Sequence, residues 1–189
     1  MSIEFQQLVQ PVACAGRVGF LGPKDAGFTE AFSSLLDAEG YLDGAAIARA
    51  RRAAEVAGER FDLVLVKLGL ISEADLCQVY AAYCGLPVVQ PADIPLQPVL
   101  SERLKPPFLK ASRTLPIVRR DNSILLAAVD PFDEETQRAI GYLLGLKVDL
   151  AVIAPADIEK AFRKLYRDES SDAQPEEQGG LAKTFADGN

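Results

Sequence analysis

The side chains most often used in catalysis are scarce in this sequence, which contains no histidine and three cysteines. Without histidine, the Ser-His-Asp and Cys-His pairs of nucleophilic catalysis are excluded. A structural zinc site needs four ligands, which three cysteines alone do not supply. Cys77 and Cys84 are seven residues apart and fall on one face of a predicted helix. We therefore expect buried thiols in a reduced, cytoplasmic protein, with no metal site and no cofactor.

Asp130 and Asp133 form an acidic pair that could act as a general acid and base. Asp133, however, stands where a helix is predicted to begin, and an aspartate there accepts hydrogen bonds from free backbone N–H groups. Asp130 directly precedes a proline in a predicted tight turn. We therefore predict structural roles for both carboxylates and no catalytic residue in the chain.

A loose internal duplication dominates the first half of the chain. Residues 31–54 align without a gap with residues 60–83, and Gly40 falls over Gly69. Apolar residues at helical spacing on both sides of each glycine predict two copies of a helix, glycine, helix unit. Glycine at the end of a helix adopts the left-handed conformation at little cost. Since one unit cannot bury its apolar faces alone, the two copies should pack against each other.

Capping residues mark where the second helix of each unit should begin. Asp43 is the predicted N-cap in the first copy. Ser72 with Asp75 has the spacing of a capping box in the second copy.

The second half of the chain changes character after a segment rich in proline. Its predicted elements are a helix from Ser101 to about Ser112 that Pro106 and Pro107 should break or bend, a hairpin of residues 115–118 and 124–129, a helix over 133–144, a strand over 148–153 and a helix over 155–166. The fold class is therefore α+β: a small α-helical N-terminal subdomain is followed by an α+β subdomain with a three-stranded sheet.

The domain organisation follows from these changes of composition. We expect an irregular leader (1–27), a helical tandem-repeat subdomain (28–86), a Pro-rich linker (87–98), an α+β subdomain (99–167) and a disordered acidic tail (168–189).

Charge limits the range of partners. The net charge of −7 and the pI near 4.7 argue against nonspecific binding to nucleic acid or to anionic membranes. No apolar run reaches the length of a transmembrane helix, so no direct membrane insertion is expected. Arg49, Arg51 and Arg52 form a basic cluster that either docks an acidic partner or lies on a solvated helix face.

Three segments together carry a family resemblance. The second repeat followed by CGLP, then LLAAVDPFDEETQ, then LGLKVDLAVIAPADIEKAFRKLY, resembles the N-terminal region of the assembly ATPases of type II secretion and type IV pili. The resemblance implies a regulatory or docking region that binds the cytoplasmic domain of an inner-membrane platform protein, peripheral to that membrane. The Walker A motif of the family's motor is absent from this sequence, so the chain itself is not expected to be an enzyme.

Part of this family binds cyclic di-GMP through a tandem pattern that begins with Arg-Leu-Gly, and the resemblance makes such a receptor the alternative function. The second copy keeps matching residues and supplies the candidate ligand-binding residues Arg60, Phe61, Leu65, Gly69 and Leu70. Phe61 replaces the leucine of the pattern, however. Asp62 and Tyr83 replace a glycine and a glutamine, and the first copy has Ala31, Ser33 and Ala54 where arginine, glycine and glutamine are required.

A carboxylate at position 62 would repel an anionic ligand and block close approach of the backbone. The residues therefore favour docking over cyclic di-GMP binding. They also favour Arg60 as a solvated or ion-paired residue in the first turn of a surface helix.

Overall fold

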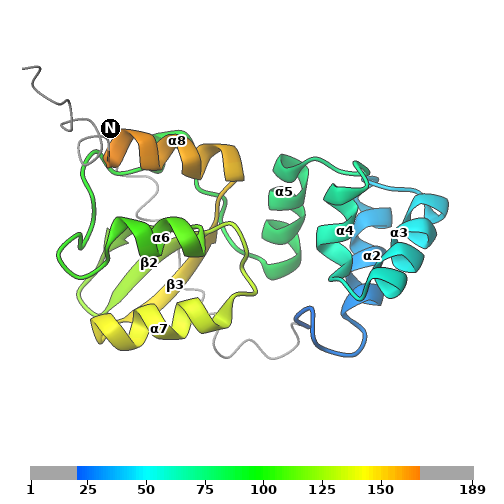
Figure 1. Cartoon of the computed structure of the whole chain (residues 1–189), viewed down its shortest axis with the longest axis horizontal. Coiled ribbons are helices and arrows are strands. Elements are labelled where there is room, and N and C mark those ends of the chain that lie inside the picture. Colours follow the sequence, from blue (N-terminus) through cyan, green and yellow to red (C-terminus); the bar gives the residue numbers. More distant parts are fainter. Residues whose placement is uncertain (1–20, 167–189) are drawn as a thin grey trace, which may run out of the picture.

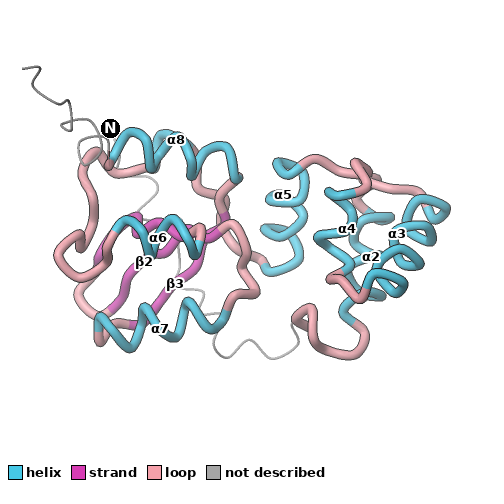
Figure 2. The backbone as a smooth tube through the Cα atoms, viewed as in Figure 1, coloured by secondary structure: helices cyan, strands magenta, loops and turns pink. Residues whose placement is uncertain are grey.

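The computed structural model describes residues 21–166, which contain seven α-helices and one three-stranded β-sheet (Figures 1 and 2). The elements are α2 (Phe28–Ala38), α3 (Gly44–Ala57), α4 (Phe61–Lys67), α5 (Glu73–Cys84), the short 3₁₀ helix η1 (Pro91–Asp93), α6 (Pro106–Ser112), β1 (Thr114–Arg119), β2 (Ser123–Ala128), α7 (Glu134–Leu144), β3 (Lys147–Val152) and α8 (Pro155–Leu165). The predicted α+β fold class is confirmed. Helices α2 to α5 gather at one end of the molecule, and α6 to α8 surround the sheet at the other (Figure 1).

The two copies of the repeat end their first helices in the same way. Gly40 and Gly69 both have positive φ angles, of 73° and 65°. In the first copy the N–H of Tyr41 donates to the carbonyl of Leu36 at 2.9 Å, and the N–H of Leu70 donates to Leu65 at 2.9 Å in the second. These are Schellman turns, which satisfy carbonyl groups at the helix end. The predicted glycine stops are confirmed.

The second helix of each copy begins at the predicted cap. The Asp43 carboxylate accepts from the N–H of Ala46 at 2.7 Å. Ser72 and Asp75 form the complete capping box. Aligned positions of the repeat thus have the same local role, although their side chains differ.

The repeat packs around shared apolar positions. The aligned phenylalanines Phe32 and Phe61 are buried, and so are the aligned leucines Leu36 and Leu65. The rings of Phe32 and Phe61 meet edge to face with centroids 6.4 Å apart. The apolar match between the copies therefore corresponds to one core that both copies share.

The sheet has the order β1-β2-β3. The predicted hairpin is confirmed, because β1 and β2 are antiparallel. β3 returns parallel to β2 after the crossover through α7, so the central strand is β2. The register of the hairpin shifts between Pro116 and Val118. Pro116 lies on the edge strand, where the missing N–H of proline is tolerated.

The prediction for Pro106 and Pro107 was wrong. These prolines do not break a helix that begins at Ser101; they are the first two residues of α6. Proline suits the start of a helix, where its φ angle is already correct and no partner for its nitrogen is needed. The preceding Lys105 is extended, with φ −83° and ψ 142°.

The chain between the repeat and α6 is tied to the sheet. Val88 forms a parallel bridge with Val152, and the N–H of Val89 donates to the Val152 carbonyl at 2.8 Å. The proposed division into subdomains, with a linker at 87–98, stays a prediction. The irregular leader up to residue 20 and the acidic tail lie outside the described residues. Within residues 21–166, no helix is both long and apolar enough to cross a membrane.

Candidate functional site

Arg60 connects the repeat with the loop that follows β2. It is the N-cap of α4, with extended backbone angles (φ −61°, ψ 131°). Its Nη1 donates to Oδ2 of Asp130 at 2.5 Å, and its Nη2 lies 3.3 Å from the second carboxylate oxygen. On its other side, Nη2 donates to Oδ2 of Asp62 at 2.5 Å and Nε donates to Oδ1 at 3.2 Å. The guanidinium is therefore held between two carboxylates.

Asp62 is the buried member of this group, since its side chain is fully inaccessible to solvent. Besides Arg60, it has a third donor in the hydroxyl of Tyr80, at 2.6 Å. Three hydrogen bonds to a buried carboxylate compensate for its lost hydration. The position where the cyclic di-GMP pattern requires glycine thus carries a charge that internal groups neutralise.

The loop after β2 supplies the other half of the contact. Asp130 also accepts from the N–H of Phe132 at 2.9 Å, which fixes the turn. The Phe132 ring lies under the guanidinium carbon of Arg60, 5.5 Å from its centroid. The same ring packs edge to face against Tyr80 and Phe28, at centroid distances of 5.4 and 5.5 Å. We call Arg60, Asp62, Tyr80, Asp130 and Phe132 the Arg60 cluster.

Electrostatics within the Arg60 cluster favour its present protonation states. Burial, the charge of Asp62 and the hydrogen bond to it raise the pKa of Tyr80 well above its ordinary value. Burial lowers the pKa of Arg60, but the carboxylates of Asp62 and Asp130 outweigh that effect and raise it overall. The phenol therefore stays neutral and the guanidinium charged at any ordinary pH.

The remaining candidate ligand residues have mostly structural surroundings. Phe61 and Leu65 are buried in the core, and Leu70 is partly buried against it. Gly69 is in the Schellman turn described above, with no atom within 4 Å of the place that a Cβ would occupy. Their assignment as ligand-binding residues stays a prediction.

A small hollow lies beside α4, between α2 and α3, with a volume of about 490 Å³. Its lining includes Arg51 and Arg60, together with Glu30, Glu55 and Glu59. Arg51 donates to Glu30 at 2.5 Å, and Arg60 is held by its own carboxylates. A dianionic ligand would meet three glutamates here and would have to displace an internal partner from each arginine.

The predicted basic cluster on α3 is divided by the fold. Arg51 turns toward α2, where its Nε also donates to the hydroxyl of Ser33 at 3.2 Å. Arg49 and Arg52 are exposed, whereas Arg51 is only partly exposed. The three arginines therefore do not form one continuous patch, and their docking role stays a prediction.

The expectations for the acidic pair and the cysteines can be compared with the structure. The carboxylate of Asp133 caps α7 by accepting from the N–H of Thr136 at 3.0 Å, as predicted. Cys77 and Cys84 are buried thiols, as predicted. Burial, with a contribution from Asp157, raises the pKa of Cys77 to about 11, so this thiol is a poor nucleophile. Among residues 21–166, no group of three or more His, Cys, Asp or Glu side chains could hold a metal ion.

Sequence reasoning missed the pairing of Arg60 with Asp130, which are 70 residues apart. One local signal was available for Asp62, which interrupts the apolar stretch FDLVLV two residues after an arginine. A carboxylate in such a stretch calls for a nearby cation or hydroxyl. No local pattern identified Tyr80 as that hydroxyl.

The helical repeat followed by a mixed sheet is also the fold of the N-terminal domain of XpsE. Residues 84–172 match the MshEN domain family. The chain therefore resembles the N-terminal domains of type II secretion and type IV pilus assembly ATPases.

Two curated relatives are the type IV pilus assembly ATPase PilB of Myxococcus xanthus and the type II secretion system protein E of Xanthomonas campestris pv. campestris. The first is 22% identical over 132 residues, covering 70% of this chain and 23% of the relative. The second is 30% identical over 124 residues, covering 64% and 22%. The chain thus spans less than a quarter of the length of either relative.

Two solved structures have a similar fold. The N-terminal domain of XpsE superposes with a TM-score of 0.60 at 26% identity, covering 72% of this chain and 94% of that one. A structure of MshE with cdg superposes with a TM-score of 0.61 at 24% identity, covering 71% and 98%. The second likeness concerns the fold alone.

Proposed function

We propose that this chain is a noncatalytic docking and regulatory module, which connects a secretion or pilus assembly ATPase to the cytoplasmic domain of an inner-membrane platform protein. The observation that carries the proposal is the match to the N-terminal domain of XpsE, of which this chain covers 94%. A domain that corresponds to one small module, with no catalytic constellation found among its described residues, is suited to binding a partner by its surface. Any ATPase activity would belong to a motor domain outside this sequence, which has no Walker A motif.

The proposal is tested by titrating the purified chain with the cytoplasmic domain of the platform protein. We expect saturable binding with a Kd of micromolar order, as is usual for modest transient interfaces. An unrelated acidic cytoplasmic domain of similar size serves as the control for nonspecific charge effects. Absence of binding at tens of micromolar, with both proteins folded by circular dichroism, would refute the docking role. Such docking would place the module at the cytoplasmic face of the membrane through its partner.

The second candidate function is a receptor for cyclic di-GMP, because the MshE structure contains cdg. The internal partners of Arg60 oppose it, since the ligand would compete with two carboxylates already in place. Calorimetry with cyclic di-GMP should give no heat of binding to the unaltered chain.

Asp130→Asn provides the sharper test of this second candidate, because it weakens one hold on Arg60 without removing the arginine. If Arg60 is a latent ligand residue, the Asp130→Asn variant should bind the dinucleotide more tightly than the unaltered chain does. Binding by neither protein would end the receptor hypothesis.

A further inference from the structure

A second and larger hollow lies between α6 and α8, away from the Arg60 cluster, with a volume of about 940 Å³. Five cationic side chains line it, against the single carboxylate of Glu159. The cations are Lys110, Arg113, Lys160, Arg163 and Lys164. We call this hollow the α6/α8 groove. It is a local excess of positive charge on a chain whose net charge is −7.

Most of these cations lack a carboxylate partner in the part of the chain that the structure describes. Lys160 pairs with Asp157 at 3.0 Å. Within residues 21–166, no carboxylate oxygen lies within 4 Å of the charged nitrogens of Lys110, Arg113 or Arg163. The Arg60 cluster, by contrast, satisfies its guanidinium from two sides. Like charges gathered without partners create a positive potential that attracts an anionic group.

The floor of the groove is apolar and contains one unsatisfied polar atom. Ile158 and Phe162 lie there, and both are buried. The hydroxyl of Tyr166, which also lines the groove, is buried and has no hydrogen-bond partner among the described residues. An occupant with an apolar side for the floor and acceptor oxygens for this hydroxyl would complement both features.

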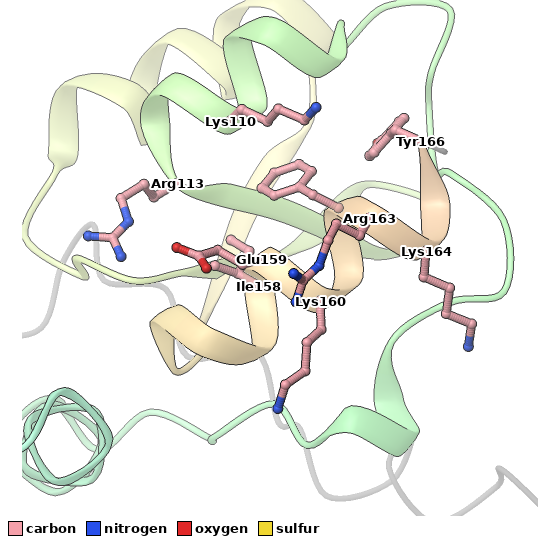
Figure 3. A pocket seen from close by; sticks show the side chains of 9 residues that line it. Lys110, Arg113, Ile158, Glu159, Lys160, Arg163, Lys164 and Tyr166 are labelled. Carbon is pink, nitrogen blue, oxygen red and sulfur yellow. The ribbon is translucent and has the colours of Figure 1, made fainter. Parts of the chain in front are cut away.

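The positions of the five cations favour one kind of anionic occupant over another. Lys110 and Arg113 stand on the α6 side and Arg163 on the α8 side, while Lys160 and Lys164 extend away from α6 (Figure 3). The cations thus surround the groove without converging on one point, as they would around a single phosphate group. Spaced carboxylates on an amphipathic polypeptide match this distribution better.

We propose that the α6/α8 groove is a docking surface for an acidic, amphipathic polypeptide segment of a partner protein. The apolar side of the segment lies on Ile158 and Phe162, and its carboxylates pair with Lys110, Arg113 and Arg163. This inference rests on the proposed docking function and assigns it a face other than the arginines of α3. The acidic balance of the whole chain does not prevent such binding, because fields are screened within about 8 Å at physiological salt.

The test uses a fluorescein-labelled helical peptide of about 16 residues, with leucine on one face and glutamate on the other. Fluorescence anisotropy should report saturable binding to the full chain that weakens as salt is raised. The double variant Lys110→Glu with Arg163→Glu should bind at least about tenfold more weakly. Arg138→Glu reverses an exposed charge on α7 outside the groove and should leave the affinity unchanged. Circular dichroism of each variant checks that it remains folded.

Several outcomes would overturn the assignment. These are equal affinity for a peptide with glutamine in place of glutamate, unchanged binding by the double variant, or displacement of the peptide by inorganic phosphate at micromolar concentration. Capture of the chain by phosphatidylglycerol vesicles, abolished by the same charge reversal, would assign the groove to a lipid surface instead.

Failure of this inference can be distinguished from failure of the proposed function. Platform-protein binding that persists in the double variant would refute the groove and leave the docking function standing. Peptide binding at the groove, without binding of the platform domain, would support the groove and refute that partner.

Discussion

Removal of the Arg60 side chain should reveal how much the buried charge of Asp62 depends on it. In Arg60→Ala, the fully buried carboxylate of Asp62 loses donors at 2.5 and 3.2 Å and keeps the hydroxyl of Tyr80. Breaking a buried ion pair by removing one partner costs about 3–5 kcal/mol. The Arg60 side chain is 29% exposed, so water can enter the vacated space, and we expect a loss at the lower end, about 3 kcal/mol.

The contact of Arg60 with Asp130 adds less to this total. The side chain of Asp130 is 36% exposed, and a pair in contact with solvent contributes about 0–1 kcal/mol. Asp130→Asn should therefore cost no more than about 1 kcal/mol, since the amide oxygen can still accept from the N–H of Phe132. Asp62 and Asp130 hold the same guanidinium group, but they contribute differently to stability because Asp62 is buried and Asp130 is partly exposed.

Urea-induced unfolding measures these losses without adding salt that would screen the charges. Lys67→Ala is the matched control, because Lys67 forms an ion pair of 2.5 Å with Glu59 between exposed side chains. It should change the free energy of unfolding by less than about 0.5 kcal/mol. Combining Arg60→Ala with Asp62→Asn should recover about 1–2 kcal/mol, since no unpaired buried charge remains. Equal effects of Arg60→Ala and Lys67→Ala, without such recovery, would refute the reasoning.

Three further variants test other parts of the fold. Gly69→Ala should lower the free energy of unfolding by about 1–2 kcal/mol because of its φ of 65° alone. Gly44→Ala, at the start of α3, should be neutral or slightly stabilising in the same urea assay, and equal effects of the two variants would contradict the Schellman assignment. Burial and Asp62 raise the pKa of Tyr80, so the stabilising contribution of its protonated hydroxyl is present below about pH 10 and is lost as the pH rises. Tyr80→Phe should therefore flatten the decline in the free energy of unfolding measured between about pH 9 and 11. Arg103 donates hydrogen bonds to the last two carbonyl groups of α7. Arg103→Ala should therefore lower the free energy of unfolding by about 1 kcal/mol and speed amide hydrogen exchange in that helix. Unchanged exchange would show that this cap is dispensable.

Elements that depend on local rules were predictable from the sequence. Gly40 and Gly69 end helices because left-handed backbone angles favour glycine, and Asp43 caps a helix because its side chain reaches the next free N–H groups. The hairpin was equally local, since its strands are joined by a short polar turn. Pro106 was misjudged because proline both ends helices and begins them, and only the extended backbone of the preceding residue decides between the two.

The site was less predictable because its parts are distant in sequence. The importance of Asp62 could be suspected from its apolar neighbours, but its donors come from Arg60 nearby and from Tyr80 one helix further on. Asp130 was correctly given a structural role, yet its partner could not be found by spacing. The α6/α8 groove forms between two helices that the strands of the sheet separate in sequence, so no single segment of the sequence predicts it.

The two copies of the repeat differ in local structure at the position of Arg60. Ala31, aligned with Arg60, lies inside α2, because that helix begins at Phe28 while α4 begins only after Arg60. The additional turn of α2 brings Phe28 against Phe132, with ring centroids 5.5 Å apart.

The first turn of α2, which precedes the first copy, therefore contacts the loop that follows β2 through the ring of Phe28, and the second copy contacts that loop through the guanidinium group of Arg60. An arginine at position 31 could not reproduce the contact of Arg60, since it would start from within a helix and not from its extended N-cap. The repeat is thus asymmetric where it meets the loop that follows β2.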